Sequence, residues 1–249
     1  MEIYRSKSDQ PLVAWQWHEP SLRNITHYIL KFASRSSGRA LDVGCGTGRV
    51  SFGLAEQGYK VYGIDIEKRV IDIARDIAKE IGSLAQFDVA DFSNGNLVQA
   101  DFYDLIVCSE VLEHVQEYRP LVDNMYRALK PGGLLIVTVP FDPRKWSVLD
   151  EYGGHVRRFT IEQIQNDLAK FINLNIIVTG FPFYRLLVRI YLVKNRLLGK
   201  EHSNEILWTS FRMRLIATLL YPLIRFDNLF AFSRLGDALI ATCVKPSSD

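Results

Sequence analysis

The chain has 249 residues, which fits one α/β domain with an elaboration and leaves room for a substantial core. Apolar residues make up 48% and charged residues 23%, and a formal net charge of +2 gives no global electrostatic argument for nucleic-acid binding. An apolar N-terminal signal region is absent, no apolar run reaches the ~18–20 residues that span a bilayer, and the three cysteines have neither metal nor disulfide spacing; we therefore expect a cytoplasmic protein.

The first predicted element is a helix over residues 22–32, where apolar residues recur with helical spacing. Trp15, Trp17 and His18 form an aromatic cluster just before it. We expect residues 1–38 to form a helical lid over a cleft; the alternative is that the tryptophans simply pack the helix onto a sheet.

A strand over 39–43 leads into the glycine loop 44–48, and a helix is predicted from Arg49 onward. Glycines let the backbone turn sharply and approach a ligand closely, and the helix N-terminus offers unpaired N–H groups. Strand, glycine loop and helix in this order indicate a nucleotide-type binding turn.

The glycine spacing and one acid distinguish between two cofactors. The pattern is G-x-G-x-G and not the G-x-G-x-x-G of dinucleotide-binding turns, and Asp42 stands just before the loop. A carboxylate repels a pyrophosphate and attracts an ammonium group. S-adenosylmethionine carries an amino group and a sulfonium and no phosphate, so Asp42 favours that cofactor over NAD; a purely structural glycine turn is the alternative.

Two further acids follow predicted strands. The strand over 60–64 ends in Asp65, which can accept hydrogen bonds from both ribose hydroxyls, worth ~1.5–3 kcal/mol each, and can also cap the helix over 67–81. The strand over 85–89 is followed by Asp91 and Phe92. Asp91 could equally make a local turn.

A strand over 102–108 runs into the segment 109–115, Ser-Glu-Val-Leu-Glu-His-Val. Glu110, Glu113 and His114 have the i, i+3, i+4 spacing that predicts one helix face. They could assist a substrate hydroxyl or hold a divalent ion, although a solvated, mutually paired face is the commoner outcome and we expect no metal. A helix over 118–129, a turn over 130–133 and a strand over 134–139 come next.

These segments resemble the class I S-adenosylmethionine-dependent methyltransferases, over roughly residues 20–180. The glycine loop is similar to motif I of that family, the segment 109–115 to its motif after strand four, and Leu-Lys-Pro-Gly-Gly at 129–133 to its turn before strand five. The resemblance implies a Rossmann-like α/β fold with a mostly parallel seven-stranded sheet in the order 3-2-1-4-5-7-6, the last strand antiparallel. It also implies S-adenosylmethionine as cofactor.

The resemblance further implies roles for single residues. An arginine placed like Arg23 contacts the cofactor carboxylate in ubiquinone-biosynthesis O-methyltransferases, and an acid placed like Asp91 lies against the adenine amino group, with Phe92 available to cover the ring. The predicted cofactor-binding set is Arg23, Asp42, Gly44, Cys45, Gly46, Gly48, Asp65, Ile66, Asp91, Phe92 and Ser109.

The long loop after Pro140 carries the predicted base. The same O-methyltransferases resemble this chain at His155, which is followed by the basic pair Arg157 and Arg158 and by a helix capped by Thr160. An imidazole can accept a phenol or alcohol proton, so we predict His155 as general base, with Glu110 and His114 as further catalytic candidates. His155 could instead order the loop or bind substrate, and the arginines could bind an acidic group or be solvated.

An insertion over 181–236 separates the strands predicted at 173–179 and 237–245. Its two predicted helices, 183–198 and 211–226, mix long aliphatic residues with arginines. They could wall a lipophilic pocket, lie peripherally on a membrane, form a homodimer surface or pack ordinarily. The whole chain, 1–249, is predicted as one methyltransferase domain: the lid, a core over 39–180 and 237–245, and this insertion.

The predicted activity is methyl transfer from S-adenosylmethionine (EC 2.1.1.-) to an oxygen of a small or lipid-like molecule. We expect no nucleic-acid substrate, because the segment 109–112 stands where an Asn/Asp-Pro-Pro-Tyr-type motif would follow strand four. An NAD-dependent oxidoreductase and a non-catalytic scaffold on the same fold are the alternatives.

Overall fold

The computed structural model describes residue 13 and residues 16–33, 37–95, 98–197, 211–231 and 233–247. Trp15, part of the predicted aromatic cluster, lies outside these residues. The strands are β1 Arg39–Val43, β2 Lys60–Asp65, β3 Gln86–Val89, β4 Tyr103–Ser109, β5 Leu129–Pro140, β6 Ile172–Thr179 and β7 Ala238–Val244. The α-helices are α2 Pro20–Ala33, α3 Arg49–Glu56, α4 Lys68–Ile81, α5 Arg119–Ala128, α6 Val148–Gly153, α7 Ile161–Asp167, α8 Phe183–Leu197 and α9 Phe211–Arg225. Short 3-10 helices are η2 Leu112–His114, η3 Pro143–Lys145 and η4 Phe226–Phe230.

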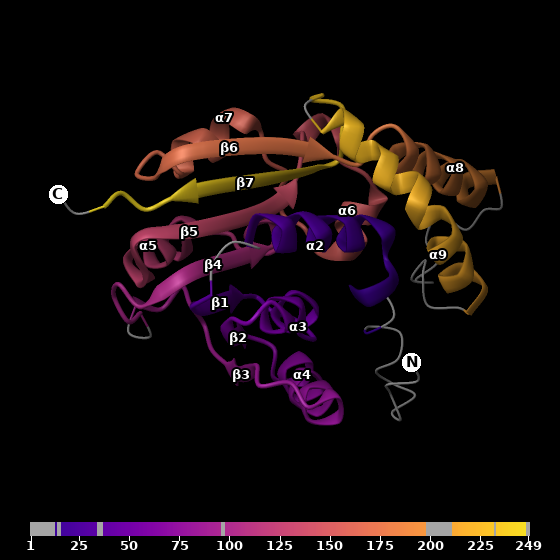
Figure 1. The fold of residues 1–249 in the computed structure, drawn as a ribbon. Coiled ribbons are helices and arrows are strands. Elements are labelled where there is room, and N and C mark those ends of the chain that lie inside the picture. Colours follow the sequence, from indigo (N-terminus) through magenta and orange to yellow (C-terminus); the bar gives the residue numbers. More distant parts are fainter. Residues whose placement is uncertain are drawn as a thin grey trace.

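The seven strands form one sheet in the order β3-β2-β1-β4-β5-β7-β6 (Figure 1). The first five strands of the chain pair in parallel, and β7 is antiparallel to both β5 and β6. The predicted fold class and strand order are therefore confirmed.

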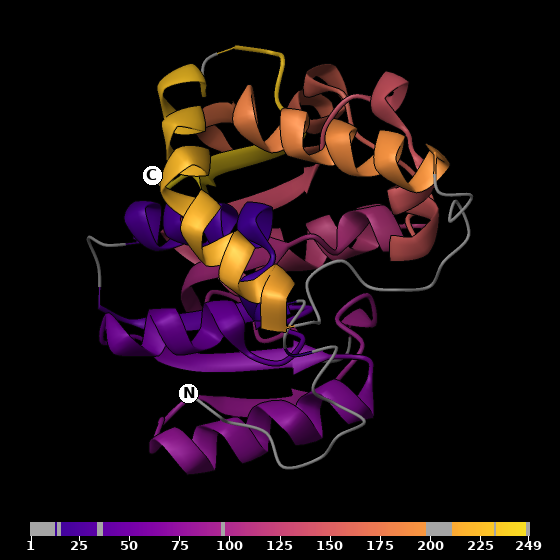
Figure 2. The same ribbon diagram turned by 90° about the vertical axis from the view of Figure 1, so that its right-hand side faces the viewer.

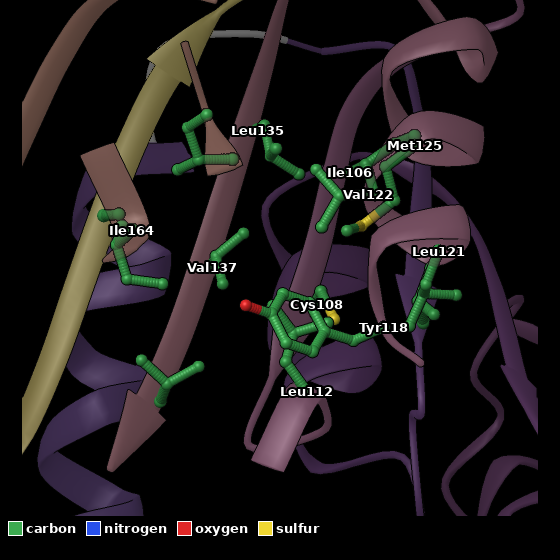
Figure 3. Packing of buried hydrophobic residues seen from close by; sticks show 14 of the residues in the cluster. Ile106, Cys108, Leu112, Tyr118, Leu121, Val122, Met125, Leu135, Val137 and Ile164 are labelled. Atoms are coloured by element: carbon green, nitrogen blue, oxygen red, sulfur yellow. The ribbon is translucent and has the colours of Figure 1, made fainter. Parts of the chain in front are cut away.

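Side chains alternate along the central strands and build a core on each face of the sheet. Ile106 and Cys108 of β4 pack with α5 and α7 on one face (Figure 3), whereas Leu105 and Val107 pack with α2, α3 and α4 on the other. Successive side chains of a strand point to opposite faces, so strands buried on both sides carry apolar residues throughout. Because β1 to β5 pair in parallel, their carboxyl ends lie together at one edge of the sheet.

The insertion lies at that edge. Figure 1 shows α8 and α9 beyond the carboxyl ends of the parallel strands, and Figure 2 looks onto this end, where α9 crosses in front of α2. Asp227 of η4 accepts hydrogen bonds from the backbone N–H groups of Phe183 and Tyr184, at 2.8 and 3.0 Å, and so caps α8. None of the described helices is both long enough and apolar enough to cross a membrane.

Three local predictions differ from the structure. The segment after Ser109 is not a helix that carries Glu110, Glu113 and His114 on one face: Glu110 has φ +56°, and only the short η2 follows. The turn predicted at 130–133 belongs to β5, which begins at Leu129. The long loop after Pro140 contains η3 and α6; Ser147 and Asp150 cap α6 reciprocally.

Candidate active site

The glycine loop is shaped by three left-handed backbone positions. Gly44, Gly46 and Gly48 have φ values of +69°, +53° and +89°, which side chains rarely adopt. The N–H groups of Gly44 and Cys45 donate to the carbonyl of Ile64 at 2.8 and 2.9 Å, which ties the loop to the end of β2. A Cβ on Gly44 would lie 2.3 Å from Cγ2 of Val111, so the close packing of the loop also requires glycine there.

Asp65 and Asp42 place two carboxyl groups beside this loop. Asp65 ends β2, and its carboxylate accepts hydrogen bonds from the N–H groups of Gly46 at 3.0 Å and Glu67 at 2.9 Å. Asp42 is buried in β1 and accepts a hydrogen bond from Ser51 Oγ at 2.6 Å. Burial raises the pKa of Asp42 to about 6, against the opposing effects of Ser51 and Arg49. Both acids line the same cavity as Gly44 and Gly46, whereas Gly48, also predicted to bind the cofactor, is not among the lining residues.

Arg49, the first residue of α3, supplies a cation that the sequence reasoning missed. Its side chain lines the cavity near Asp42, Glu110 and Glu19, and burial lowers its pKa to about 10. The structure does not bring Arg23 into the cavity: its guanidinium lies 4.0 Å above the ring of Tyr221 in α9. A basic residue directly after the G-x-G-x-G loop is the signal that would have pointed to Arg49.

The remaining predicted cofactor residues also line the cavity. The carboxylate of Asp91 accepts hydrogen bonds from Ser93 N at 2.9 Å and Ser93 Oγ at 2.6 Å. Asp91 thus makes the local turn that was the alternative to its role in cofactor binding. Phe92 is buried, and the side chain of Ile66 is exposed. Ser109 Oγ lies 3.0 Å from Thr138 Oγ1 of β5.

Thr138 also holds Glu110, one of the predicted catalytic residues. Thr138 Oγ1 donates to Glu110 Oε1 at 2.9 Å, and the Glu110 N–H donates to the Thr138 carbonyl at 3.0 Å. Burial raises the pKa of Glu110, although Thr138, His155 and Arg49 oppose that effect. These bonds explain how Glu110 lines the cavity without the predicted helix.

His155 is fixed by an acid that the sequence analysis did not select. Its Nδ1 lies 3.0 Å from Oδ1 of Asp150. The same carboxylate accepts hydrogen bonds from Arg158, from Nε to Oδ1 at 2.7 Å and from Nη2 to Oδ2 at 3.0 Å. Burial opposes ionisation of Asp150, but the bonds from His155 and Arg158 outweigh it and lower the pKa of Asp150 to about 2. A carboxylate on Nδ1 keeps a proton there and leaves Nε2 to accept one. Only the capping pattern Ser147-x-x-Asp150 marked this acid in the sequence.

Arg157 and Arg158, both predicted to bind an acidic group or be solvated, have different surroundings. Arg158 is held by Asp150 and by the carbonyl of Phe141 at 3.2 Å, whereas Arg157 Nη2 donates to the carbonyl of Gln116 at 2.7 Å. Arg158 lines the cavity, and Arg157 is not among the lining residues.

A second histidine lies against the first. The rings of His114 and His155 are 4.9 Å apart at 77°, and His114 Nδ1 lies 3.2 Å from the carbonyl of Gly154. Burial lowers the pKa of His114. Glu113 is fully buried beside them, and neither of its carboxyl oxygens has a hydrogen-bond partner in the described part of the chain.

Glu113, His114 and His155 therefore converge on one point. Each offers a ligand atom, and these atoms lie within 4.8 Å of one another, an arrangement that could hold a divalent ion. Burial and the nearby carboxylate of Glu110 raise the pKa of Glu113 well above its usual range. A protonated, neutral Glu113 is therefore the alternative to a bound ion.

The cavity that joins the glycine loop to Glu110, His114 and His155 measures about 1760 Å³, and Glu113 is not among its lining residues. A site for one small ligand commonly measures ~300–1,000 Å³, so this cavity has room for a cofactor and a second molecule. Its wall beyond His155 comes largely from α8 and is rich in apolar and aromatic side chains: Phe183, Tyr184, Val188, Tyr191 and Leu192. Gln16, Glu19 and Leu22 close another side, and Gln16 Oε1 accepts hydrogen bonds from Thr47 N at 3.0 Å and Oγ1 at 2.6 Å.

Comparison with known proteins agrees with this geometry. A family model described as a methyltransferase domain matches residues 15–177. The ubiquinone biosynthesis O-methyltransferase of Xylella fastidiosa (strain M23) is 40% identical over 111 residues, which cover 45% of this chain and 45% of that protein. The protein of the same name from Sodalis glossinidius (strain morsitans) is 31% identical over 176 residues, covering 67% of this chain and 70% of its own. The chain thus spans less than half the length of the first curated relatives it matches.

Solved structures share the fold at low sequence identity. Haemonchus contortus phosphoethanolamine N-methyltransferase 2, in complex with phosphomonomethylethanolamine and S-adenosylhomocysteine, has a TM-score of 0.68 and 19% identity, and the match covers 96% of this chain and 58% of that chain. The [4+2]-cyclase SpnF has a TM-score of 0.63 and 20% identity, with coverage of 91% and 82%. The chain belongs to the methyltransferase-domain family and, within it, to the class I S-adenosylmethionine-dependent methyltransferases.

Proposed function

We propose that this protein transfers a methyl group from S-adenosylmethionine to a hydroxyl oxygen of a small or lipophilic acceptor. The observation that carries the proposal is the position of His155, held by Asp150 in the wall of the same cavity that the glycine loop and Asp65 line. A hydroxyl acceptor needs a group that takes its proton, and a nitrogen acceptor that is already neutral does not.

The residues at the glycine loop fit the cofactor. The loop brings backbone close to the cavity at positions where a Cβ would collide, and Asp65 presents carboxylate oxygens there for ribose hydroxyls. Asp42, with a pKa of about 6, supplies negative charge for an ammonium group at neutral pH, and Arg49 supplies positive charge for a carboxylate. When bound, S-adenosylmethionine supplies an electrophilic methyl group on a sulfonium. The acids around the loop would repel a pyrophosphate, which argues against the NAD-dependent alternative.

The protein's own contribution is orientation and proton transfer. Cavity walls that hold donor and acceptor in line and exclude water can lower the activation barrier by roughly 7–11 kcal/mol. Asp150 keeps the Nδ1 proton of His155, so Nε2 takes the hydroxyl proton as the oxygen attacks the methyl group, and imidazolium forms beside the Asp150 carboxylate. His114 lies at the same wall and is the second group placed to touch the acceptor.

The acceptor side of the cavity supports a molecule with apolar surface. Its wall on α8 is mostly aliphatic and aromatic, and Arg185 and Arg189 line it as well. Two of the described relatives are named as O-methyltransferases of ubiquinone biosynthesis, which agrees with methylation at oxygen.

The test is a screen of phenols and lipid-like alcohols with radiolabelled S-adenosylmethionine, followed by His155→Gln and His114→Gln. A general base contributes about 10²–10⁴-fold, so His155→Gln should lower turnover by at least ~10²-fold with the affinity for S-adenosylhomocysteine unchanged. Near-normal turnover in His155→Gln would remove it as the base. If His114→Gln alone abolished turnover, the proton would go to His114.

A further inference from the structure

The insertion exposes an unusual amount of apolar surface. On α8, Leu186, Ile190, Val193 and Leu197 are between 50% and 81% exposed, and their i, i+4, i+7, i+11 spacing puts them on one stripe. On α9 and η4, Leu219, Leu223, Phe226 and Phe230 repeat the spacing and are between 38% and 70% exposed. These two stripes are what we call the insertion face.

The charge of these helices has one sign. The sequence of α8 contains four Arg or Lys residues and that of α9 three, with no Asp or Glu in either helix. The helical repeat places Arg189 on one edge of the α8 stripe and Lys194 on the other. Long basic side chains beside an apolar stripe can lay their stems along apolar groups and reach anionic headgroups with their charged ends.

Helix α8 is held in place by contacts outside the insertion face. Asp227 caps its first turn, Arg185 donates to the carbonyl of Leu235 at 2.9 Å, and Arg185 Nε lies 3.7 Å from the carboxylate of Asp237. A shallow groove of about 610 Å³ runs along the outer side of α8, lined by Leu186, Arg189, Ile190, Val193, Lys194 and Leu197. The stripe is therefore presented by an anchored helix.

We infer that the insertion face docks on a membrane surface that carries anionic lipids. Apolar side chains would enter the headgroup boundary, and the basic edges of α8 would meet the lipid phosphates. The face lies outside residues 15–177, the part of the chain that the methyltransferase-domain family model matches. Leu186 and Arg189 border both the groove and the active-site cavity, so docking would place the cavity beside the lipid; a lipid acceptor is a consequence that rests on the proposed function.

Flotation with vesicles tests the docking without any methyl acceptor. The purified chain is mixed with vesicles of phosphatidylcholine alone or of equal parts phosphatidylcholine and phosphatidylglycerol. We expect binding to the mixed vesicles, weakened by salt and by loss of phosphatidylglycerol. The double variant Ile190→Ser, Val193→Ser should bind at least about tenfold more weakly, and Lys194→Gln about fivefold more weakly.

Matched controls lie on α4 and just beyond it, away from the insertion. Leu84→Ser removes a side chain that is 93% exposed, and Lys79→Gln removes an exposed cation of α4; both should bind like the unaltered chain. Circular dichroism and S-adenosylhomocysteine affinity check the fold, and if the double variant misfolds, the exposed Lys194→Gln still tests the inference.

Absence of binding to the mixed vesicles, or equal binding by all variants, would overturn the docking inference. A dimer in sedimentation that the double variant dissociates would overturn it as well, because a second copy would then cover the face.

Discussion

Asp150 is the residue whose replacement tests the site most sharply, because it holds both the predicted base and a buried cation. Replacement by Asn keeps the size and removes the charge. Asp150 is 1% exposed, and the side chain of Arg158 that it pairs with is 11% exposed. Loss of one partner of a buried ion pair costs about 3–5 kcal/mol, and Asp237, 3.8 Å from Arg158 Nη1, would offset part of that cost. Because the free energy of unfolding of a typical protein is about 5–15 kcal/mol, the Asp150→Asn variant should still fold at low temperature.

The chemical effect follows from the imidazole of His155. With the carboxylate gone, the side-chain amide introduced by Asp150→Asn can donate to Nδ1 and so favours the tautomer with its proton on Nε2, which cannot accept the hydroxyl proton. We expect turnover to fall by roughly 10–10²-fold, part of the 10²–10⁴-fold that a general base supplies, with unchanged affinity for S-adenosylhomocysteine. Nitrogen-15 NMR of labelled histidine reads the tautomer directly, and His155→Gln assigns the signal.

Two results would refute the reasoning on Asp150. One is a His155 signal that already carries its proton on Nε2 in the unaltered protein. The other is near-normal turnover in an Asp150→Asn protein whose stability has fallen, since Asp150 would then only order the loop.

Three further perturbations test separate parts of the structure. Burial raises the pKa of Glu19 from 4.5 to about 7, so the folded state binds this proton more tightly than the unfolded state does. The resulting stabilisation is present below pH 4.5, and about 3 kcal/mol of it is lost as the pH rises to about 7. Glu19→Gln should remove this dependence of the free energy of unfolding on pH, measured by urea titration at several pH values. Gly44→Ala should weaken the binding of S-adenosylhomocysteine at least ~10-fold. The left-handed φ costs an alanine roughly 1–2 kcal/mol, and its Cβ would lie 2.3 Å from the side chain of Val111. Gly82→Ala, at nearly the same φ of +68° with nothing within 4 Å, should lose stability alone; equal affinities in the two variants would contradict the close-packing argument. Asp227→Ala should lower the free energy of unfolding by about 1–2 kcal/mol and speed proteolysis within 181–236, and unchanged cleavage would show that the cap does not hold α8.

The strand order was implied by the resemblance to a family, whereas the α/β class and most of the cofactor wall could be predicted from local signals in the sequence. Apolar runs of strand length between helical repeats indicate a doubly covered parallel sheet, and the glycines need their special backbone wherever they stand. Asp42 was found because it adjoins that loop in the sequence, and Asp65 because it ends the next predicted strand. Glu110 also lines the cavity, although the helix expected to carry it is absent; Thr138, far along the chain, holds it instead.

The rest of the site depends on side-chain pairings, between distant segments or across a loop, that residue spacing does not reveal. Arg23 was selected through the family resemblance, by its spacing before the first strand. In the structure its guanidinium packs against Tyr221 in α9, and Arg49 lines the cavity instead. Asp150 has the sequence signature of a helix cap, and its contact with His155 arises only when α6 closes against the following loop.

The central claim is that this cavity binds S-adenosylmethionine through the glycine loop and Asp65. Calorimetric titration with S-adenosylmethionine and S-adenosylhomocysteine, on the unaltered chain and on Asp65→Ala, tests it most directly, with Asp76→Ala on the exposed face of α4 as control. Hydrogen bonds to a charged acceptor are worth about 1.5–3 kcal/mol each, so we predict micromolar binding that weakens at least ~100-fold in Asp65→Ala and is unchanged in Asp76→Ala. Absence of binding to the well-folded protein, or equal affinity in Asp65→Ala, would contradict the account.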